Sequence, residues 1–218
     1  MTGVSARTAA IAGILFAVLF TAGLLLTGGL PSDVSDQKAI DYYADSGNRA
    51  EVIIGGYCLI LSMLCILPFL VHVRARLAAS PRSAAFAPIV FVSGLLFAAM
   101  GMAGAIAFMW LPAGVTFGNA PAPQSADLAR LGPQLGFGLL LVAGGLSAAV
   151  AFGAAAIGAI RGHHGSAWLG WAGLVVAILQ IADVAFIPLF LLALWVLVAS
   201  AVLIRRGPAP AAAAAVPA

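Results

Sequence analysis

The sequence predicts an all-α fold, a polytopic membrane helix bundle with six transmembrane helices and both termini in the cytoplasm. The first observation is composition: 63% of the 218 residues are hydrophobic and 8% are charged, whereas soluble domains carry about 25% charged residues. The second is a series of long uncharged runs, each near the roughly 20 residues that cross a bilayer as a helix. The third is the position of the charges, which lie mostly between those runs.

Four of the predicted spans are clear apolar runs, at residues 8–30, 52–73, 87–111 and 133–160. The first run is longer than the roughly 7–15 apolar residues of a signal peptide, so we expect it to remain as a span. The last apolar stretch, 167–204, would measure about 57 Å as one helix, which exceeds the hydrocarbon thickness of about 30 Å. We therefore expect two shorter spans there, at 166–182 and 185–204. The low-complexity Ala/Pro tail, 207–218, is expected to be disordered.

The positions of the charges predict the orientation. Positive residues favour the cytoplasmic side of short loops. With six spans and the N-terminus inside, seven of the ten basic residues lie inside: Arg7, Arg74, Arg76, Arg82, Arg161, Arg205 and Arg206. All seven acidic residues then lie outside: Asp33, Asp36, Asp41, Asp45, Glu51, Asp127 and Asp183. A five-span chain would move Arg205 and Arg206 outside and break this pattern.

The largest polar segment is the outer loop 31–51. Ser35 or Asp36 can cap a short helix there, and Tyr42 and Tyr43 are expected at the level of the lipid headgroups, where aromatic side chains are stable. Tyr43 is expected to face the membrane. The loop is either a connector on the membrane surface, which we favour, or a lid or docking segment for a membrane-protein partner.

Small residues predict close helix packing in the fourth span. Gly145, Ala149 and Gly153 recur at four-residue spacing, which lets two helices approach closely. We expect this face to pack within the bundle, and a contact with a partner protein is the alternative. Trp195 lies mid-span and is expected to pack there. The preceding outer loop is expected to be irregular, with Ser125 capping one brief helical turn.

Three residues are candidates for a polar path through the membrane: Pro68, Gln180 and Asp183. Pro68 lacks an N–H and frees a backbone carbonyl. Asp183 is the single acidic residue between 167 and 204. Because a charged carboxylate at mid-bilayer costs about 2.5–3.5 kcal/mol, we favour an outer turn in which Asp183 caps the last span. In the alternative, Gln180 and Asp183 face the path.

The sequence shows no set of residues that would converge into a catalytic, cofactor-binding or metal site. The histidines, His72, His163 and His164, fall at the predicted cytoplasmic ends of spans. Ser147 resembles the active-site serine of rhomboid intramembrane proteases, but the last span has no histidine to activate it, so we expect an interhelical hydrogen bond instead. The chain also lacks the basic stripe with interleaved aromatics that binds nucleic acid.

Several separated motifs have a familiar pattern: Arg7 before the first span, Asn48-Arg49 before the second, and a close with "WLGW" at 168–171, "LW" at 194–195 and "RR" at 205–206. In this pattern the chain resembles a broad group of small bacterial six-span membrane proteins that share a domain of unknown function. The resemblance implies a six-helix membrane protein without an assigned activity. The alanine-rich composition suits a high-GC bacterium, which places the chain in the plasma membrane.

The function predicted from the sequence is that of a non-enzymatic accessory or partner-binding protein in the plasma (inner) membrane. The basis is a packed bundle that lacks convergent reactive groups and whose largest polar loop, 31–51, is outside. The alternative is a small transporter or channel for an apolar or weakly polar solute, with Pro68, Gln180 and Asp183 as elements of its path.

Overall fold

The computed structural model describes residues 4–28, 34–162, 167–182 and 187–205, and within these residues the chain is helical with no strand. The predicted tail 207–218 lies outside this description. The elements, in chain order, are α1 (Ala6–Thr27), α2 (Asp36–Ala44), α3 (Ser46–Ala78), α4 (Phe86–Phe117), α5 (Ala126–Phe137), the π-helix η1 (Gly138–Gly144), α6 (Gly145–Arg161), α7 (Ala167–Leu179), the 3₁₀ turn η2 (Gln180–Ala182) and α8 (Ile187–Arg205).

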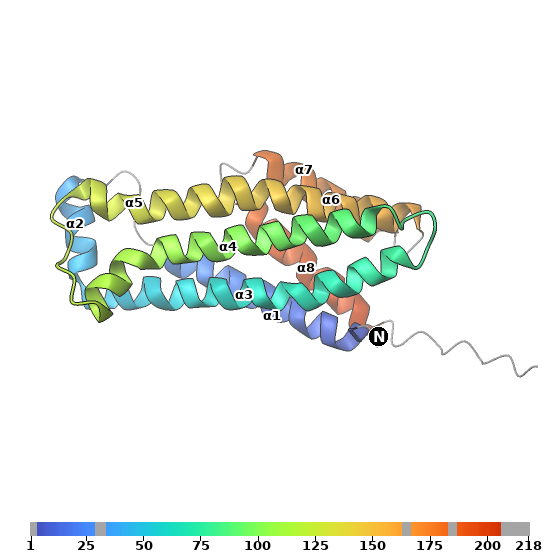
Figure 1. The fold of residues 1–218 in the computed structure, drawn as a ribbon, viewed down its shortest axis with the longest axis horizontal. Coiled ribbons are helices and arrows are strands. Elements are labelled where there is room, and N and C mark those ends of the chain that lie inside the picture. The colour runs from blue at the N-terminus through green and yellow to red at the C-terminus, as the bar shows by residue number, and fades with distance from the viewer. Residues whose placement is uncertain (1–3, 29–33, 163–166, 183–186, 206–218) are drawn as a thin grey trace, which may run out of the picture.

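The long helices run side by side along one axis (Figure 1). α1 packs against α3 and α8, α3 packs against α4, and α4 packs against α6, which in turn packs against α7. Five helical segments of the described chain are long and apolar enough to cross a membrane: α1, α3, α4, the continuous stretch Ala126–Arg161, and α8. The sixth apolar helix, α7, has 13 residues. The all-helical fold is confirmed, and the count of six spans stays a prediction.

The outer surface of the bundle is unusually apolar. Many large hydrophobic side chains are about half exposed or more, among them Val18, Leu25, Ile106, Val142 and Val175. A soluble monomer rarely exposes contiguous apolar surface on this scale. The helix lengths and this surface together indicate a multi-pass membrane protein, with lipid covering the exposed side chains.

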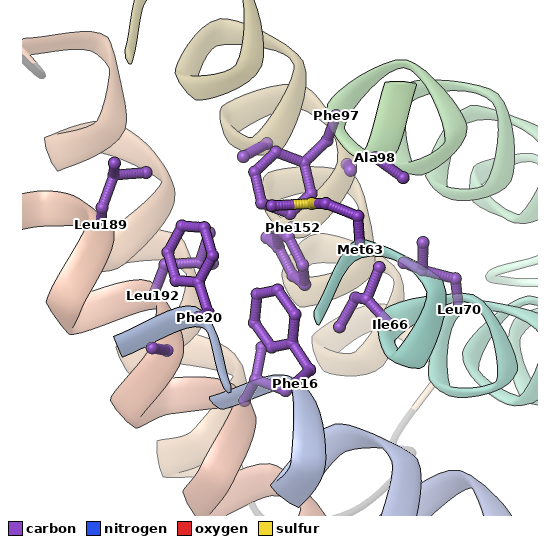
Figure 2. Packing of buried hydrophobic residues seen from close by; sticks show 14 of the residues in the cluster. Phe16, Phe20, Met63, Ile66, Leu70, Phe97, Ala98, Phe152, Leu189 and Leu192 are labelled. Atoms are coloured by element: carbon purple, nitrogen blue, oxygen red, sulfur yellow. The ribbon is translucent and has the colours of Figure 1, made fainter. Parts of the chain in front are cut away.

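Aromatic rings fill the centre of the bundle (Figure 2). Phe97 of α4 contacts Phe16 and Phe20 of α1 at centroid distances of 6.2 and 6.3 Å, and Phe152 of α6 at 6.2 Å. Trp195 of α8 extends the cluster, 5.7 Å from Phe152. Each edge-to-face pair contributes about 0.5–1.5 kcal/mol beyond its buried area. The predicted packing role of Trp195 is confirmed: its indole N–H also donates to the Leu169 carbonyl at 3.1 Å.

Glycines allow the backbones to approach closely at several helix crossings. A Cβ on Gly23 would lie 2.9 Å from the Gly55 carbonyl oxygen, and one on Gly104 would lie 2.9 Å from the Gly136 carbonyl oxygen. Such contacts replace the hydrophobic driving force that helices lack inside a membrane. A Cβ on Gly153 would meet the Ala177 side chain of α7 at an ordinary 3.4 Å, and Gly145, Ala149 and Gly153 are all buried, so this small-residue face packs within the bundle as predicted.

The segment before the fourth span differs from the prediction. Ser125 does cap a helix, since its Oγ accepts from the Leu128 N–H at 3.3 Å. That helix is not one brief turn, because α5, η1 and α6 form a continuous helical stretch from Ala126 to Arg161. Gly132 and Gly136, which weaken an isolated helix, pack against Trp110 and Phe108 of α4. This packing offsets their low helical propensity.

Candidate functional site

The short helix α2 lies at one end of the bundle (Figure 1), and the acidic residues of the described chain lie on it and on the helix ends beside it. We define the acidic cap as α2 together with Asp45, residues 46–51 of α3 and residues 126–130 of α5. Tyr43 of α2 is 1% exposed and packs with Leu111 of α4 and Ala129 of α5. The expectation that Tyr43 faces the membrane is therefore wrong. The sequence of α2 is compatible with Tyr43 facing either the membrane or the protein. It does not show that the apolar ends of α4 and α5 cover this side chain.

Two arginines attach α2 to the longer helices. Arg130 of α5 forms an ion pair with Asp36 at 2.8 Å and donates to the Val34 carbonyl at 2.7 Å. The Arg49 guanidinium of α3 donates to the Tyr43 and Ala44 carbonyls at 2.7 and 2.8 Å. These are carbonyls at the C-terminal end of α2, where a helix has no internal donors. Arg49 therefore supplies bonds that the C-terminal end of α2 cannot make alone, and Arg130 holds its N-terminal end.

The two tyrosine hydroxyls of α2 release their protons less readily than an exposed tyrosine does. Burial raises the pKa of Tyr43, and the neighbouring Tyr42 raises it further. Burial also raises the pKa of Tyr42, with a smaller contribution from the negative charge of Glu51. The two rings pack edge to face with centroids 5.1 Å apart. The Tyr42 hydroxyl is buried and has no hydrogen-bond partner among the described residues.

The acidic cap and the opposite end of the bundle carry opposite charge. All the acidic residues of the described chain are exposed and lie in the acidic cap: Asp36, Asp41, Asp45, Glu51 and Asp127. Arg49 and Arg130 are partly buried in the hydrogen bonds given above, so Lys38 is the one exposed cation of the acidic cap. The opposite end, called the basic end below, carries Arg7, Arg74, Arg76, Arg82, Arg161 and Arg205, with no acidic residue in its described part.

The candidates for a polar path lie in different parts of the bundle. Gln180 is 1% exposed and belongs to η2, which contacts α6, α7 and α8. Pro68 lines a groove between α1 and α3. Along α8, Pro188 beside Gln180 lies about 18 Å from Ser200, and Ser200 is level with Phe69, the neighbour of Pro68. The structure therefore does not bring Gln180 and Pro68 together. Asp183 lies outside the described residues.

Gln180 forms one strong hydrogen bond and leaves one group unpaired. Its Nε2 donates to the Pro188 carbonyl at 2.6 Å, across the connection between α7 and α8. A carbonyl only accepts, so this bond fixes which way the amide points. The Gln180 Oε1 is buried without a partner among the described residues. An unpaired buried acceptor costs about 1–3 kcal/mol, so its surroundings or a bound donor must offset this cost.

Other polar side chains within the helices have local roles. Ser147 donates to the Ala143 carbonyl of its own helical stretch at 2.8 Å, which replaces the interhelical bond expected from the sequence. His72, expected to be an ordinary residue at a span end, is buried, and its Nδ1 lies 3.1 Å from the Val4 carbonyl oxygen. His72 could have been singled out from the sequence as a polar residue inside an apolar run. His163 and His164 lie outside the described residues.

The described residues and the comparisons with known proteins assign no further site. Within the described chain no three His, Cys, Asp or Glu side chains group closely enough to hold a metal ion, and Cys58 and Cys65 are free thiols. No family model, curated protein or solved structure matches the chain. The resemblance to the small six-span bacterial proteins stays a prediction, and the acidic cap is the candidate site that the structure itself offers.

Proposed function

We propose that this chain is a non-enzymatic protein of the plasma membrane that binds a partner protein through the acidic cap. The termini lie in the cytoplasm, and the acidic cap lies on the other side. The observation that carries the proposal is that α2 is fixed by Arg49, Arg130 and Tyr43 while its carboxylates stay exposed. The partner has a basic surface on that side of the membrane.

The construction of the acidic cap supports a docking role over that of a simple connector. A helix of nine residues is too short to be stable in water alone, because isolated helices below about 12–15 residues are marginal. The buried Tyr43 and the two arginines supply the missing stability. A surface held in one conformation loses little entropy on binding, and its negative charge attracts a basic partner and speeds association.

A second candidate is a small transporter or channel for an apolar or weakly polar solute. It is favoured by the Gln180 Oε1, an acceptor without a partner among the described residues in an otherwise apolar contact. The cluster of Phe16, Phe20, Phe97 and Phe152 at the bundle centre opposes it, because these rings fill the space that a central path would use. We therefore place this function second.

Purification of the full chain with its partners after cross-linking in native membranes tests the proposal. The charge-removing variant carries Asp41→Asn, Glu51→Gln and Asp127→Asn, which keep the side-chain shapes. We expect it to recover the cross-linked partner about tenfold less than the unaltered chain, and high salt to reduce recovery in the same way. The matched control, Lys38→Gln, removes the exposed cation and should not reduce recovery.

Two outcomes would overturn docking through the acidic cap. One is equal partner recovery by the charge-removing variant and the unaltered chain. The other is recovery of the unaltered chain as a lone monomer that moves a small solute across liposome membranes. Loss of that flux in Gln180→Leu would then support the second candidate.

A further inference from the structure

The groove between α1 and α3 is open toward the surrounding membrane. Its volume is about 420 Å³, within the roughly 300–1,000 Å³ of typical ligand sites. The lining side chains that matter here are Thr8, Ile11 and Leu15 from α1, and Leu61, Cys65 and Pro68 from α3. They are almost entirely apolar, and Ile11, Leu15 and Leu61 are about half exposed. Only an apolar chain can cover them without loss of free energy.

The groove has a polar end and an apolar end. The start of α1 and the end of α3 lie at the basic end (Figure 1). Thr8 and Pro68 are therefore nearer to that end than Leu15 and Leu61, which lie seven residues, about 10 Å, further along each helix. Pro68 has no N–H to donate to the Leu64 carbonyl, one turn earlier on α3. The Leu64 carbonyl therefore lacks its usual helical donor, and with the Thr8 hydroxyl it makes this part of the groove more polar than the lining below it. This order of groups, polar near the surface and apolar below, is that of a glycerophospholipid.

Two arginines lie where the groove meets the surface. Arg7 is four residues before Ile11, and Arg76 is eleven residues, about three helical turns, beyond Cys65, so each follows the groove side of its own helix. Both side chains are exposed, and the described part of the basic end has no acidic residue that could neutralise them. Positive charge here complements a phosphate that has no balancing cation.

We infer that the α1–α3 groove binds one acyl chain of an anionic phospholipid, whose phosphate lies between Arg7 and Arg76. The acyl chain covers the apolar lining down to Leu15 and Leu61. Cys65 and Pro68 form the floor under the upper part of the chain. The lipid belongs to the leaflet at the basic end. This inference is independent of partner binding at the acidic cap, which lies at the opposite end of the bundle (Figure 1).

Native mass spectrometry of the full chain in a neutral detergent tests the inference. Phosphatidylglycerol and phosphatidylcholine with identical acyl chains are added in turn, and the bound lipid is counted. We expect one phosphatidylglycerol to be retained about tenfold more strongly than phosphatidylcholine. The reason is that each arginine near the membrane surface increases the affinity for an anionic lipid several-fold. Equal retention of the two lipids would overturn the inference, whatever the variants show.

Filling the groove should remove the bound lipid. Cys65→Trp places a large ring in the groove from α3, and Leu15→Trp does so from α1, so one of them suffices if the other does not fold. The matched control is Ile106→Trp, since Ile106 of α4 is 58% exposed and lies outside the groove. We expect loss of the retained lipid in the groove variants and none in the control. Unchanged lipid retention in a folded groove variant contradicts the inference.

Charge variants separate this site from general attraction to the basic end. Arg7→Gln with Arg76→Gln should reduce phosphatidylglycerol retention about tenfold. Arg82→Gln with Arg161→Gln removes the same charge from the same end, on the segment before α4 and on α6, which do not line the groove, and should change retention by less than about twofold. If both pairs reduce retention equally, the lipid is held by the field of the basic end and not by the groove.

Discussion

Gln180 brings an amide into the apolar contact between η2 and helices α6 and α8. Its bond to the Pro188 carbonyl joins the two sides of the α7–α8 hairpin at a distance of eight residues. Pro188 is near the start of α8, so its carbonyl can also accept a backbone N–H from the next turn of that helix. The Gln180 amide is therefore a second donor to this carbonyl and not its only one. The free energy that is lost by burying the unpaired Oε1 is therefore about as large as the free energy gained from the Nε2 hydrogen bond.

Two substitutions of Gln180 distinguish a structural role from a path. Gln180→Leu removes the bond and the unpaired oxygen together, so we expect the free energy of unfolding to change by less than about 1 kcal/mol. Gln180→Glu keeps the shape, but its ionised carboxylate cannot donate to Pro188, so we expect a loss of about 3 kcal/mol or more. Thermal unfolding in detergent measures both. Equal melting temperatures for the two variants would contradict this account.

The tyrosines of α2 predict a loss of stability at alkaline pH. Burial raises the pKa of both Tyr42 and Tyr43 in the folded chain. Above about pH 10 the unfolded chain releases these protons while the folded chain keeps them, so the free energy of unfolding falls as pH rises.

Tyr42→Phe should reduce this fall in the free energy of unfolding. Because the Tyr42 hydroxyl is buried without a partner among the described residues, the same substitution should stabilise the chain by about 1 kcal/mol at pH 7. Melting temperatures from pH 7 to 11 measure both effects. The exposed Tyr57→Phe is the control, and the same pH dependence in both variants would contradict the prediction.

At the scale of elements, the hydrophobic runs of the sequence predict where the helices lie. The exact ends of each helix, and the face that it buries, depend on the helices that pack against it. The apolar run 8–30 sufficed to predict α1, because lipid-facing and core-facing residues are both apolar. The extension of the fourth helix back to Ala126 was missed, because Pro133 and two glycines signal a break unless their packing on α4 is known. Tyr43 was placed on the wrong face for the same reason. Its partner Ala129 lies 86 residues further along the chain, and local pattern does not reveal such contacts.

Gly132 is predicted to be required for the close crossing of α5 and α4. A Cβ there would lie 2.8 Å from the Ala107 carbonyl oxygen and 2.7 Å from Nε1 of Trp110. Gly132→Ala should therefore cost about 1–3 kcal/mol, despite the better helical propensity of alanine. Gly138→Ala is the matched control, because a Cβ there meets no atom within 4 Å. Thermal unfolding compares the two, and a melting temperature no lower for Gly132→Ala would sink the prediction.

Arg49 is predicted to hold α2 in place. Arg49→Gln removes its two bonds to the last carbonyls of α2 and its contact with Thr116, 3.3 Å away on α4. We expect hydrogen exchange of the α2 amides to rise about tenfold or more, since each charged hydrogen bond contributes about 1.5–3 kcal/mol. Exchange in α4 and α6 should not change. Lys38→Gln, on α2 itself, serves as control; a similar rise in that variant would show that charge, and not the bonds of Arg49, stabilises α2.

At the scale of the whole molecule, the charges divide between two ends of the bundle. The start of α1 and the ends of α3, α6 and α8 all lie at the basic end, and α2 lies at the other (Figure 1). Because α6 and α8 end together, the chain after α8 emerges on the same side whether α7 crosses the whole membrane or only part of it. The short length of α7 therefore leaves the predicted side of the C-terminus unchanged.

Cysteine labelling in intact cells tests both the orientation and the six-span count. In a chain with Cys58→Ala and Cys65→Ala, we expect a membrane-impermeant thiol reagent to label Asp41→Cys of the acidic cap, and to label Arg82→Cys of the basic end only after permeabilisation. Ile181→Cys decides the count, because its side chain is 67% exposed at the end of α7. With six spans, Ile181→Cys is labelled from the same side as Asp41→Cys. If the reagent reaches it from neither side, α7 and α8 turn back within the membrane, and the chain has four full spans and one hairpin that enters from the basic side.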